Sequence, residues 1–394
     1  MASEFAALQR QATWILVPSS SSQHVIGCCW VFKLKCKTDG SVARFKARLV
    51  AKGNHQTVGL DFDETFSPVV KPATVRLVLS LAAQYHWSLR QLDVSNAFLH
   101  GSLKEHVFMR QPSGFVDPQH PSHVCLLQKS IYGLRQAPRA WFEKFSTHLL
   151  TIGFTASLAD PSLFVYKNGS TMIYLLLYVN DIILTGSSTT AVQDLIHELA
   201  QAFELKDLAK RVLRYIRGTL SHGILFQPGP LRLTAFTDSD WAGNPVDHRS
   251  TIGFLIFLGN NLLTWASKKQ PTVSRSSMEA EYRALAIGAA ELAWLRMLLR
   301  DLGVYVSHAP VLWCDNTSAI SLASNPVFQA RTKHVEIDYH FVREKVVRGD
   351  LSVKFISTDD QLAELLTKAL PSPRFITLST KLLHSISQHS FEGG

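Results

Sequence analysis

The sequence predicts a protein of the α+β class, in which largely antiparallel sheets are covered by helices. Two observations carry this prediction. Short apolar runs separated by turn residues recur through the first half, and three such runs followed by alternating helical and strand patterns fill the second half. The chain has 394 residues, of which 46% are hydrophobic and 18% charged, so it can form two or three globular domains rather than a disordered polymer.

The first half opens with apolar runs that predict a β-meander within residues 14–56, with a turn at Thr38-Asp39-Gly40. A second hairpin is expected where Asn180-Asp181 separates two apolar runs. The other elements expected in this half are helices at residues 74–85, after Ala137-Pro138 and at 190–203, and a strand at 89–94.

The second half begins near Leu231 with three strands that predict an antiparallel meander, and alternating helices and strands then predict one mixed sheet. A basic helical piece and a linker are expected at residues 209–230, between the halves, and a tail at 371–394. The expected strands are 232–237, 250–257, 261–267, 310–314 and 352–357, and the expected helices are 276–302, 317–323, 333–347 and 360–368.

Composition limits the partners and the compartment. The formal net charge of +9 suits a polyanionic partner such as nucleic acid, because binding to phosphates releases counterions. Five cysteines without a CxxC pair favour a reducing intracellular compartment, cytoplasmic or nuclear. The most apolar stretch, residues 172–184, has Asn180 and Asp181 near its centre, so the sequence predicts a soluble protein without a membrane span.

Two acids in the first half stand where metal ligands are often found. Asp93 lies in a predicted strand, and Asp181 lies at the tip of the predicted hairpin. If these strand ends meet, two carboxylates can hold a pair of divalent cations for phosphoryl transfer. Magnesium prefers such oxygen ligands. Both residues can equally be ordinary turn acids, and spacing alone favours that interpretation.

Four acids in the second half are spaced like a nuclease site. They end a strand, begin the long helix, follow the fourth strand and lie in the last helix, and they are Asp238, Glu281, Asp315 and Glu364. Such a cluster can bind two Mg²⁺ ions and hydrolyse a phosphodiester. A helix-capping acid, two turn acids and a solvated helix face explain the same residues, and spacing alone favours this plainer interpretation.

Ordered motifs add a resemblance to a known family. The first half contains RFKARLVAKG, ETFSPVVK, LDVSNAFLHG, KSIYGLRQAPRAWF and YVNDIILTGS, and the second contains LTAFTDSDWAG, SRSSMEAEYRAL, LWCDNTSAI and STDDQLAELLTKAL. The chain resembles a fragment of a copia-type retrotransposon Pol polyprotein. The resemblance implies reverse transcriptase fingers and palm over residues 10–208 and a ribonuclease H-like domain over 231–370. It also implies Mg²⁺ as cofactor, with template–primer and RNA–DNA hybrid as partners.

For the first half, the resemblance implies roles for individual residues. Asp93 and Asp181 would be metal ligands, and Phe98 would block a ribose 2′-hydroxyl or simply be a core aromatic. Lys46 and Arg48 would contact the triphosphate, or else be solvated strand residues. The residues expected to line the templating-base and nucleotide pocket are Tyr132, Gly133 and Arg135.

The chain departs from the family pattern at two places in this half. Asn180 stands where the family has the more critical aspartate of the hairpin, and a neutral amide holds a metal far less strongly. Lys206-Asp207-Leu208 runs almost directly into the basic helical piece, so the primer grip and thumb are missing. Both departures predict an internally truncated chain with a defective polymerase. A deoxynucleotide would be a partner only if the palm were active.

For the second half, the resemblance implies an Asp–Glu–Asp–Asp metal cluster. Asp238, Glu281 and Asp315 fill the first three places, and Glu364 replaces the fourth aspartate with a longer side chain. If the register slipped by two, Asp240 and Glu279 would take part instead.

Further residues would support this site. Lys268, Lys269 and Arg275 would hold the phosphates of the hybrid, unless they form only a solvated loop. His334 and His340 would assist proton transfer, or be structural. The expected function is therefore that of a retrotransposon-derived reverse transcriptase–ribonuclease H whose second activity alone survives. The alternative is a catalytically silent fragment that only binds nucleic acid.

Overall fold

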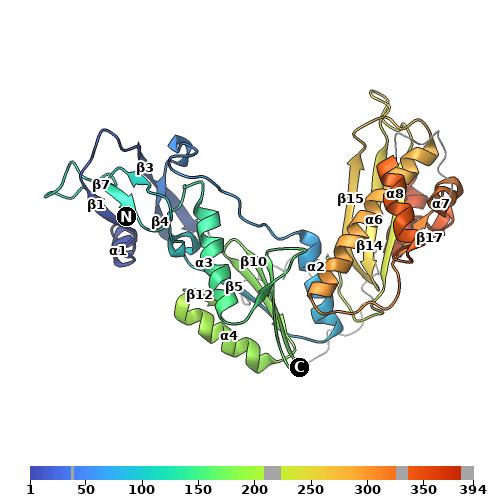
Figure 1. Cartoon of the computed structure of the whole chain (residues 1–394), viewed down its shortest axis with the longest axis horizontal. Coiled ribbons are helices and arrows are strands. Elements are labelled where there is room, and N and C mark those ends of the chain that lie inside the picture. Colours follow the sequence, from blue (N-terminus) through green and yellow to red (C-terminus); the bar gives the residue numbers. More distant parts are fainter. Residues whose placement is uncertain (37–39, 208–222, 325–335, 383–394) are drawn as a thin grey trace.

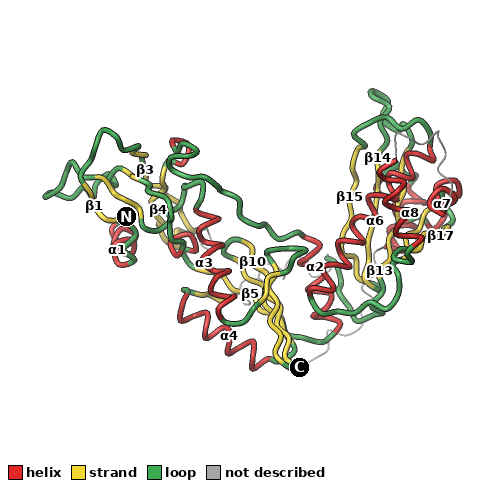
Figure 2. Tube along the Cα trace, viewed as in Figure 1, coloured by secondary structure: helices red, strands yellow, loops and turns green. Residues whose placement is uncertain are grey.

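The computed structural model of the protein describes residues 1–36, 40–207, 223–324 and 336–382. Figure 1 shows three parts along the longest axis: an N-terminal part, a central sheet and a C-terminal sheet. Helices and strands are mixed in all three, as Figure 2 shows, which confirms the α+β class. The predicted basic helical piece falls largely on residues 208–222, which lie outside the described residues.

The N-terminal part contains two small sheets. One has the strand order β1-β7-β6-β2, and the other is the hairpin of β3 and β4. The bounds are α1 (Ala2–Arg10), β1 (Trp14–Val17), β2 (Val25–Ile26), β3 (Cys28–Cys36), β4 (Val42–Ala51), the 3₁₀ helix η1 (Gly53–His55), β6 (Phe108–Met109) and β7 (Val124–Leu127). The predicted meander within residues 14–56 is wrong, because β1 pairs with β7 and β2 with β6, about a hundred residues away. The antiparallel pairing of β3 with β4 is confirmed.

The central sheet has six strands in the order β12-β5-β11-β10-β9-β8. The predicted hairpin of β10 and β11 is confirmed, whereas β8 and β9 were not predicted. The bounds are α2 (Pro72–Gln84), β5 (Leu89–Val94), η2 (Ala97–His100), α3 (Ala137–Thr151), β8 (Thr155–Ala156), β9 (Leu163–Asn168), β10 (Thr171–Tyr178), β11 (Asp181–Gly186), α4 (Thr189–Ala202) and β12 (Leu205–Asp207).

Both faces of the central sheet are buried because β10 is apolar on both sides. Leu175 and Leu177 point into a core shared with α3 and α4. Tyr174 and Leu176 point the other way, into a core shared with α2 and with the C-terminal part. A run of consecutive apolar residues is typical of a strand covered on both faces.

The C-terminal sheet has the order β15-β14-β13-β16-β17, with the first three strands antiparallel and the last two parallel to β13. This is the predicted meander followed by a mixed sheet, and the fold is ribonuclease H-like. The bounds are β13 (Leu233–Asp240), β14 (Thr251–Leu258), β15 (Asn261–Lys269), α6 (Ser277–Asp301), β16 (Val311–Cys314), α7 (Thr317–Ser324), α8 (Glu336–Val347) and β17 (Ser352–Phe355).

The end of the chain differs from the prediction. The expected helix at 360–368 is wrong, because this stretch forms two 3₁₀ turns, η4 (Thr358–Asp360) and η5 (Leu362–Leu366). The predicted tail from residue 371 begins instead with an α-helix, α9 (Ser372–Leu382), which buries Leu378 against η5. The apolar residues of α9 pack against η5, and the sequence of α9 by itself does not indicate that this contact forms.

The C-terminal part packs directly on the central part. Leu77 and Leu81 of α2 share one hydrophobic core with α6 and β14. Polar contacts reinforce it: the Tyr174 hydroxyl donates to the Leu302 carbonyl at 2.8 Å. The Asp301 carboxylate accepts three hydrogen bonds of 2.8–3.0 Å from residues 157–159. The two parts therefore form a continuous packed body. Among the described helices, none is long and apolar enough to cross a membrane.

Candidate functional site

The first candidate site lies where β5 ends beside the β10–β11 turn. The strand register places Asp181 opposite Asp93. The Asn180 side chain donates a hydrogen bond from Nδ2 to Oδ1 of Asp93. The turn residue Val179 has φ +54°, a strained value for a β-branched residue, and Trp141 Nε1 donates to its carbonyl at 2.5 Å. The amide of Asn180 therefore satisfies Asp93 at the position where a second carboxylate was expected.

A cavity of about 920 Å³, here called the central cavity, opens above this turn. The basic face of the β3–β4 hairpin forms one wall, and Asp93 and Asn180 lie at the other. Asp181 is not among its lining residues. The charged and aromatic residues that line it are Glu4, Lys35, Arg44, Phe45, Lys46, Arg48, Asp93, Phe98, Tyr132, Glu204 and Lys206. Positive charge thus dominates a cavity that retains one of the two predicted strand acids.

Three of the predicted nucleotide-contacting residues are in contact within the central cavity. The Arg48 guanidinium lies 4.3 Å from the Tyr132 ring centroid, and the Tyr132 and Phe98 rings meet edge-on at 5.2 Å. Arg48 Nε is buried without a hydrogen-bond partner among the described residues. Burial and the neighbouring Arg48 and Arg44 lower the pKa of Lys46, against the opposing effect of Glu4. This wall is suited to an anion.

Gly133 and Arg135 lie outside the lining of the central cavity. Gly133 has φ +91°, and a Cβ there would collide with the Ala51 carbonyl, so the position requires glycine for close backbone approach. Arg135 Nε donates to the Gly53 carbonyl at 2.9 Å. Both residues hold the loop that carries Tyr132, and neither one lines the central cavity.

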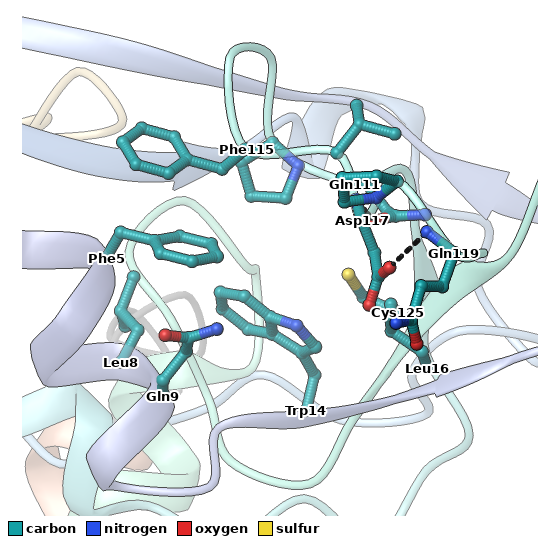
Figure 3. Close-up of a pocket in the computed structure, with 13 residues that line it drawn as sticks. Phe5, Leu8, Gln9, Trp14, Leu16, Gln111, Phe115, Asp117, Gln119 and Cys125 are labelled. Atoms are coloured by element: carbon teal, nitrogen blue, oxygen red, sulfur yellow. Dashed lines mark hydrogen bonds between the residues drawn. The ribbon is translucent and has the colours of Figure 1, made fainter. Parts of the chain in front are cut away.

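A second cavity, of about 750 Å³, lies in the N-terminal part between α1, β1 and the loop at residues 111–119 (Figure 3). Phe5 stacks on Phe115 with ring centroids 4.4 Å apart, and Trp14 lies beside Phe5. Asp117 is the only residue among its described lining with a formal charge at neutral pH. This cavity offers apolar surface and no group of carboxylates.

The second candidate site is the acid cluster of Asp238, Glu281, Asp315 and Glu364. It is assembled from β13, the first turns of α6, the end of β16 and η5. One oxygen from each of Asp238, Asp315 and Glu364 lies within 4.8 Å of the other two, and Glu281 is similarly close to Asp315 and to Cys314. The structure therefore brings together the four acids that are far apart in the sequence.

Glu281 is the most perturbed member of the acid cluster. It is 5% exposed, and its Oε1 accepts the Ser239 amide at 3.0 Å. Its Oε2 is buried without a hydrogen-bond partner among the described residues. Burial, and then the charges of Asp238 and Asp315, raise the pKa of Glu281 to about 9. Gly288, two turns later in α6, allows the helix to pack closely against β13. A Cβ at this position would lie only 2.7 Å from the Thr237 side chain.

Asp238 and Glu364 are contacted by cationic side chains. Asp238 is fully buried, and it accepts hydrogen bonds from Thr367 and, at 3.2 Å, from Lys368 Nζ. Lys368 Nζ also lies 2.9 Å from Glu364 Oε1, and Arg374 Nη2 lies 2.7 Å from Glu364 Oε2. Burial raises the pKa of Asp238. Burial would also raise the pKa of Glu364, but hydrogen bonds from Arg374 and Lys368 lower it.

The residues considered for a slipped register have other contacts. Asp240 accepts a hydrogen bond from the Thr251 amide. Glu279 is buried at the start of α6, where it accepts the Arg275 amide at 2.9 Å and pairs with Arg283 at 2.7 Å. Neither residue is in the acid cluster, so the structure favours the unshifted register.

The residues that were predicted to support the acid cluster are not among the residues that form it. Lys268 and Lys269 are exposed at the end of β15, and Lys269 pairs with Asp247 at 2.7 Å. Arg275 is exposed just before α6. His340 is exposed on α8, with its ring 5.3 Å from that of Tyr339. His334 lies outside the described residues.

The side chains of the acid cluster are suited to bind a divalent cation, and those at the β10–β11 turn are less suited to do so. In the cluster, four carboxylates converge and one buried oxygen of Glu281 has no partner, which is the donor set of a hard cation. At the β10–β11 turn, an amide replaces one carboxylate and gives its N–H to the other.

Comparison with known proteins decides the family. The family model "Reverse transcriptase (RNA-dependent DNA polymerase)" matches residues 11–218, more than half of the chain. The chain is 39% identical to the retrovirus-related Pol polyprotein from transposon RE2 of Arabidopsis thaliana. That alignment covers 97% of this chain and 33% of the relative. The chain belongs to the copia-type reverse transcriptase family. The central sheet and the β3–β4 hairpin both lie within the residues that this family model matches.

Other relatives give the same picture. The chain is 31% identical to the Pol polyprotein from transposon TNT 1-94 of Nicotiana tabacum, over 95% of this chain and 37% of the relative. The chain thus spans about a third of the length of these copia-type Pol polyproteins. The RE2 alignment runs over 487 positions, more than the 394 residues of the chain, so the relative carries residues that this chain lacks.

A solved ribonuclease H domain from Mycobacterium tuberculosis, studied as a fusion with maltose-binding protein, aligns with 39% of this chain and 99% of its own. The identity is 12% and the TM-score 0.27. The ribonuclease H-like assignment therefore rests on the strand order of the C-terminal sheet rather than on this likeness.

The sequence did not reveal the cations around the acid cluster. Lys368 could have been found, because it follows Glu364 by four residues, a spacing typical of an ion pair within a helix. Arg374 and Thr367 carried no such signal, since they reach the cluster only through the fold of η5 and α9.

Proposed function

We propose that the C-terminal half is a divalent-cation-dependent ribonuclease H that cuts RNA in RNA–DNA hybrids, and that the central sheet is a palm that no longer polymerises DNA. The observation that carries the first claim is the acid cluster, in which Asp315 lies close both to Asp238 and Glu364 and to Glu281, one of whose buried oxygens has no hydrogen-bond partner among the described residues. The burial of three of these carboxylates is costly unless a cation compensates their charge.

The residues of the cluster have distinct tasks in this proposal. Divalent cations, Mg²⁺ in the cell, would activate water and stabilise the leaving oxygen of the phosphodiester. Asp238 is held rigid by Thr367, and Glu281 by the Ser239 amide, so both present fixed oxygens. Asp315 is half-buried and bonded to Thr358 at 3.1 Å, which leaves it beside solvent, where a substrate would arrive.

The palm is proposed to be inactive as a polymerase. The bond from Asn180 to Asp93 satisfies the remaining carboxylate with a neutral donor. Loss of one anionic ligand from a two-metal site is expected to cost on the order of 10²–10⁴ in rate. The residues that longer relatives carry and this chain lacks add to that loss, and a deoxynucleotide is not a productive substrate here.

The substrate assignment rests on charge and family. The chain has a net charge of +9; Lys268 and Lys269 are exposed on the edge strand β15, and Arg275 is exposed in the loop before α6. Such residues would contact hybrid phosphates, and binding should weaken steeply as salt rises.

Cleavage of a labelled RNA–DNA hybrid by the purified full chain tests this function. We expect Mg²⁺-dependent cutting of the RNA strand that is lost in Asp238→Asn and kept in the neighbouring Asp240→Asn, with both variants folded by circular dichroism. Absence of Mg²⁺-dependent cutting by the wild-type chain would overturn the proposal.

A silent, nucleic-acid-binding fragment is the second candidate. It is favoured by one observation: Lys368 and Arg374 already neutralise part of the acid cluster. Salt-sensitive hybrid binding without cleavage, unchanged in Asp238→Asn, would support this function instead.

A further inference from the structure

The two sides of the acid cluster are not equivalent. On one side, Glu281 has an unpartnered buried oxygen, and Asp315 is half-buried with a bond to Thr358. On the other side, Lys368 Nζ lies 3.2 Å from Asp238 Oδ1 and 2.9 Å from Glu364 Oε1. A charged ammonium group therefore bridges two of the four carboxylates.

Glu364 is contacted on both of its oxygens. Oε1 meets Lys368, and Oε2 accepts from Arg374 Nη2 at 2.7 Å and Nε at 3.3 Å. Arg374 comes from α9 and also donates to Asp359 in η4, at 3.0 Å. Charge-assisted bonds of this kind are the strong ones, so α9 holds the Glu364 side chain in a fixed direction.

We propose that Lys368 is a built-in cation of the acid cluster that competes with a divalent cation for the oxygens of Asp238 and Glu364, while Arg374 holds Glu364 in that arrangement. The inference rests on the proposed function, since it assumes that the cluster binds metal. A cation shared by Asp238 and Glu364 needs the same oxygens as Lys368, because the ammonium lies between them. Metal therefore enters first beside Glu281 and Asp315, and the Glu364 side binds only when Lys368 moves away.

The competition has a chemical basis in the length of Glu364. A glutamate reaches one methylene further than an aspartate, and in this chain its two oxygens meet Lys368 and Arg374. Lys368 is 36% exposed, so solvent partly screens its end of the pair, whereas its partner Asp238 is fully buried.

Direct measurement of Mn²⁺ binding to the full chain by isothermal titration calorimetry tests the inference without relying on activity. We expect Lys368→Met to bind Mn²⁺ at least about tenfold more tightly than wild type, or to gain a second bound ion. Lys368→Arg, which keeps the charge, should bind like wild type. Lys354→Met, which removes an exposed lysine of β17, controls for the change in net charge.

A second variant keeps the test valid if Lys368→Met does not fold. Glu364→Asp withdraws the carboxylate from Lys368 and Arg374, and it should also raise Mn²⁺ affinity. The inference would be overturned if Lys368→Met bound Mn²⁺ with the affinity of wild type. If only Glu364→Asp folds, a wild-type Mn²⁺ affinity in that variant would overturn it.

Asp238→Asn separates this inference from the proposed function. If Asp238→Asn binds Mn²⁺ as wild type does, the cluster is not the metal site and the proposed function fails. If Asp238→Asn loses Mn²⁺ binding while Lys368→Met matches wild type, the metal site stands and only the competition is wrong.

Discussion

The palm and the ribonuclease H-like domain each place acids at strand ends, yet their chemistry differs. In the palm, one amide gives its N–H to Asp93, so the remaining charge is satisfied within the protein. In the C-terminal domain, four carboxylates crowd together, and burial with mutual repulsion raises the pKa of Glu281 to about 9. The acid cluster can attract a cation because Lys368 and Arg374 compensate only part of its charge, whereas a single Asp-to-Asn difference removes one of the two charges at the β10–β11 turn.

The two regions also differ in how their acids are supported. The β10–β11 turn contains the strained Val179, and it is held by hydrogen bonds from Trp141 to the Val179 carbonyl and from the Val94 amide to the Asn180 carbonyl. The acid cluster draws residues from β13, the end of β16, a 25-residue helix and the 3₁₀ turn η5. The acid cluster keeps four carboxylates although Glu364 stands where the family pattern has aspartate, whereas the site at the turn has Asn180 in place of one carboxylate.

The largest expected effect separates two neighbouring glutamates of α6. Glu281→Gln should lower hybrid cleavage by at least about 10²-fold, because it removes a charged member of the acid cluster. Glu279→Gln should stay within about fivefold of wild type, since Glu279 caps α6 and pairs with Arg283. Gel-based cleavage rates check this, with melting temperatures of both variants as the control. Equal losses in both variants would contradict the assignment.

A second carboxylate at the β10–β11 turn would make the palm site resemble the acid cluster. Asn180→Asp should restore Mn²⁺ binding in the palm, because Asp93 would then face a second carboxylate rather than an amide donor. DNA synthesis should stay near background, since the residues present only in longer relatives remain absent. Calorimetry and primer extension measure the two outcomes in one preparation. Robust synthesis would show that the missing segment is dispensable.

The pH dependence of stability should reveal the raised pKa of Glu281 in the acid cluster. Glu281 has a pKa of about 9 in the folded protein against an ordinary value of 4.5, so the folded state binds a proton that the unfolded state releases. Without divalent cations, stability should therefore fall as pH rises from about 4.5 to about 9. Glu281→Gln should flatten this slope in thermal melts with EDTA. An equal slope in both proteins would show that Glu281 is not the titrating group.

The smallest effect concerns the interface between the two regions. Asp301→Ala removes a carboxylate that accepts three hydrogen bonds from residues 157–159 of the palm. The free energy of unfolding should drop by about 2 kcal/mol, because the Ser157 hydroxyl and the amides of Leu158 and Ala159 lose their acceptor. Denaturant unfolding followed by fluorescence should still show one transition, since one hydrophobic core spans both parts. Two separated transitions in the wild-type chain would mean that the regions fold independently.

The sequence alone determined the local elements and the identity of the acids. Strand β5, the β10–β11 hairpin, helix α6 and the C-terminal meander lie where apolar periodicity placed them, because such patterns reflect which face of an element is buried. The ordered motifs also identified Asp238, Glu281, Asp315 and Glu364, and their convergence follows from the family fold.

Tertiary structure alone decided the pairings and the counter-ions. Nothing in the run at Trp14–Val17 indicates that its partner is β7, because strand pairing depends on long-range chain closure rather than on local pattern. Arg374 reaches Glu364 only because α9 packs on η5, and Lys368 reaches Asp238 only because η5 packs against β13. The sequence therefore names the acids that a metal requires, and the fold decides which cations already stand beside them.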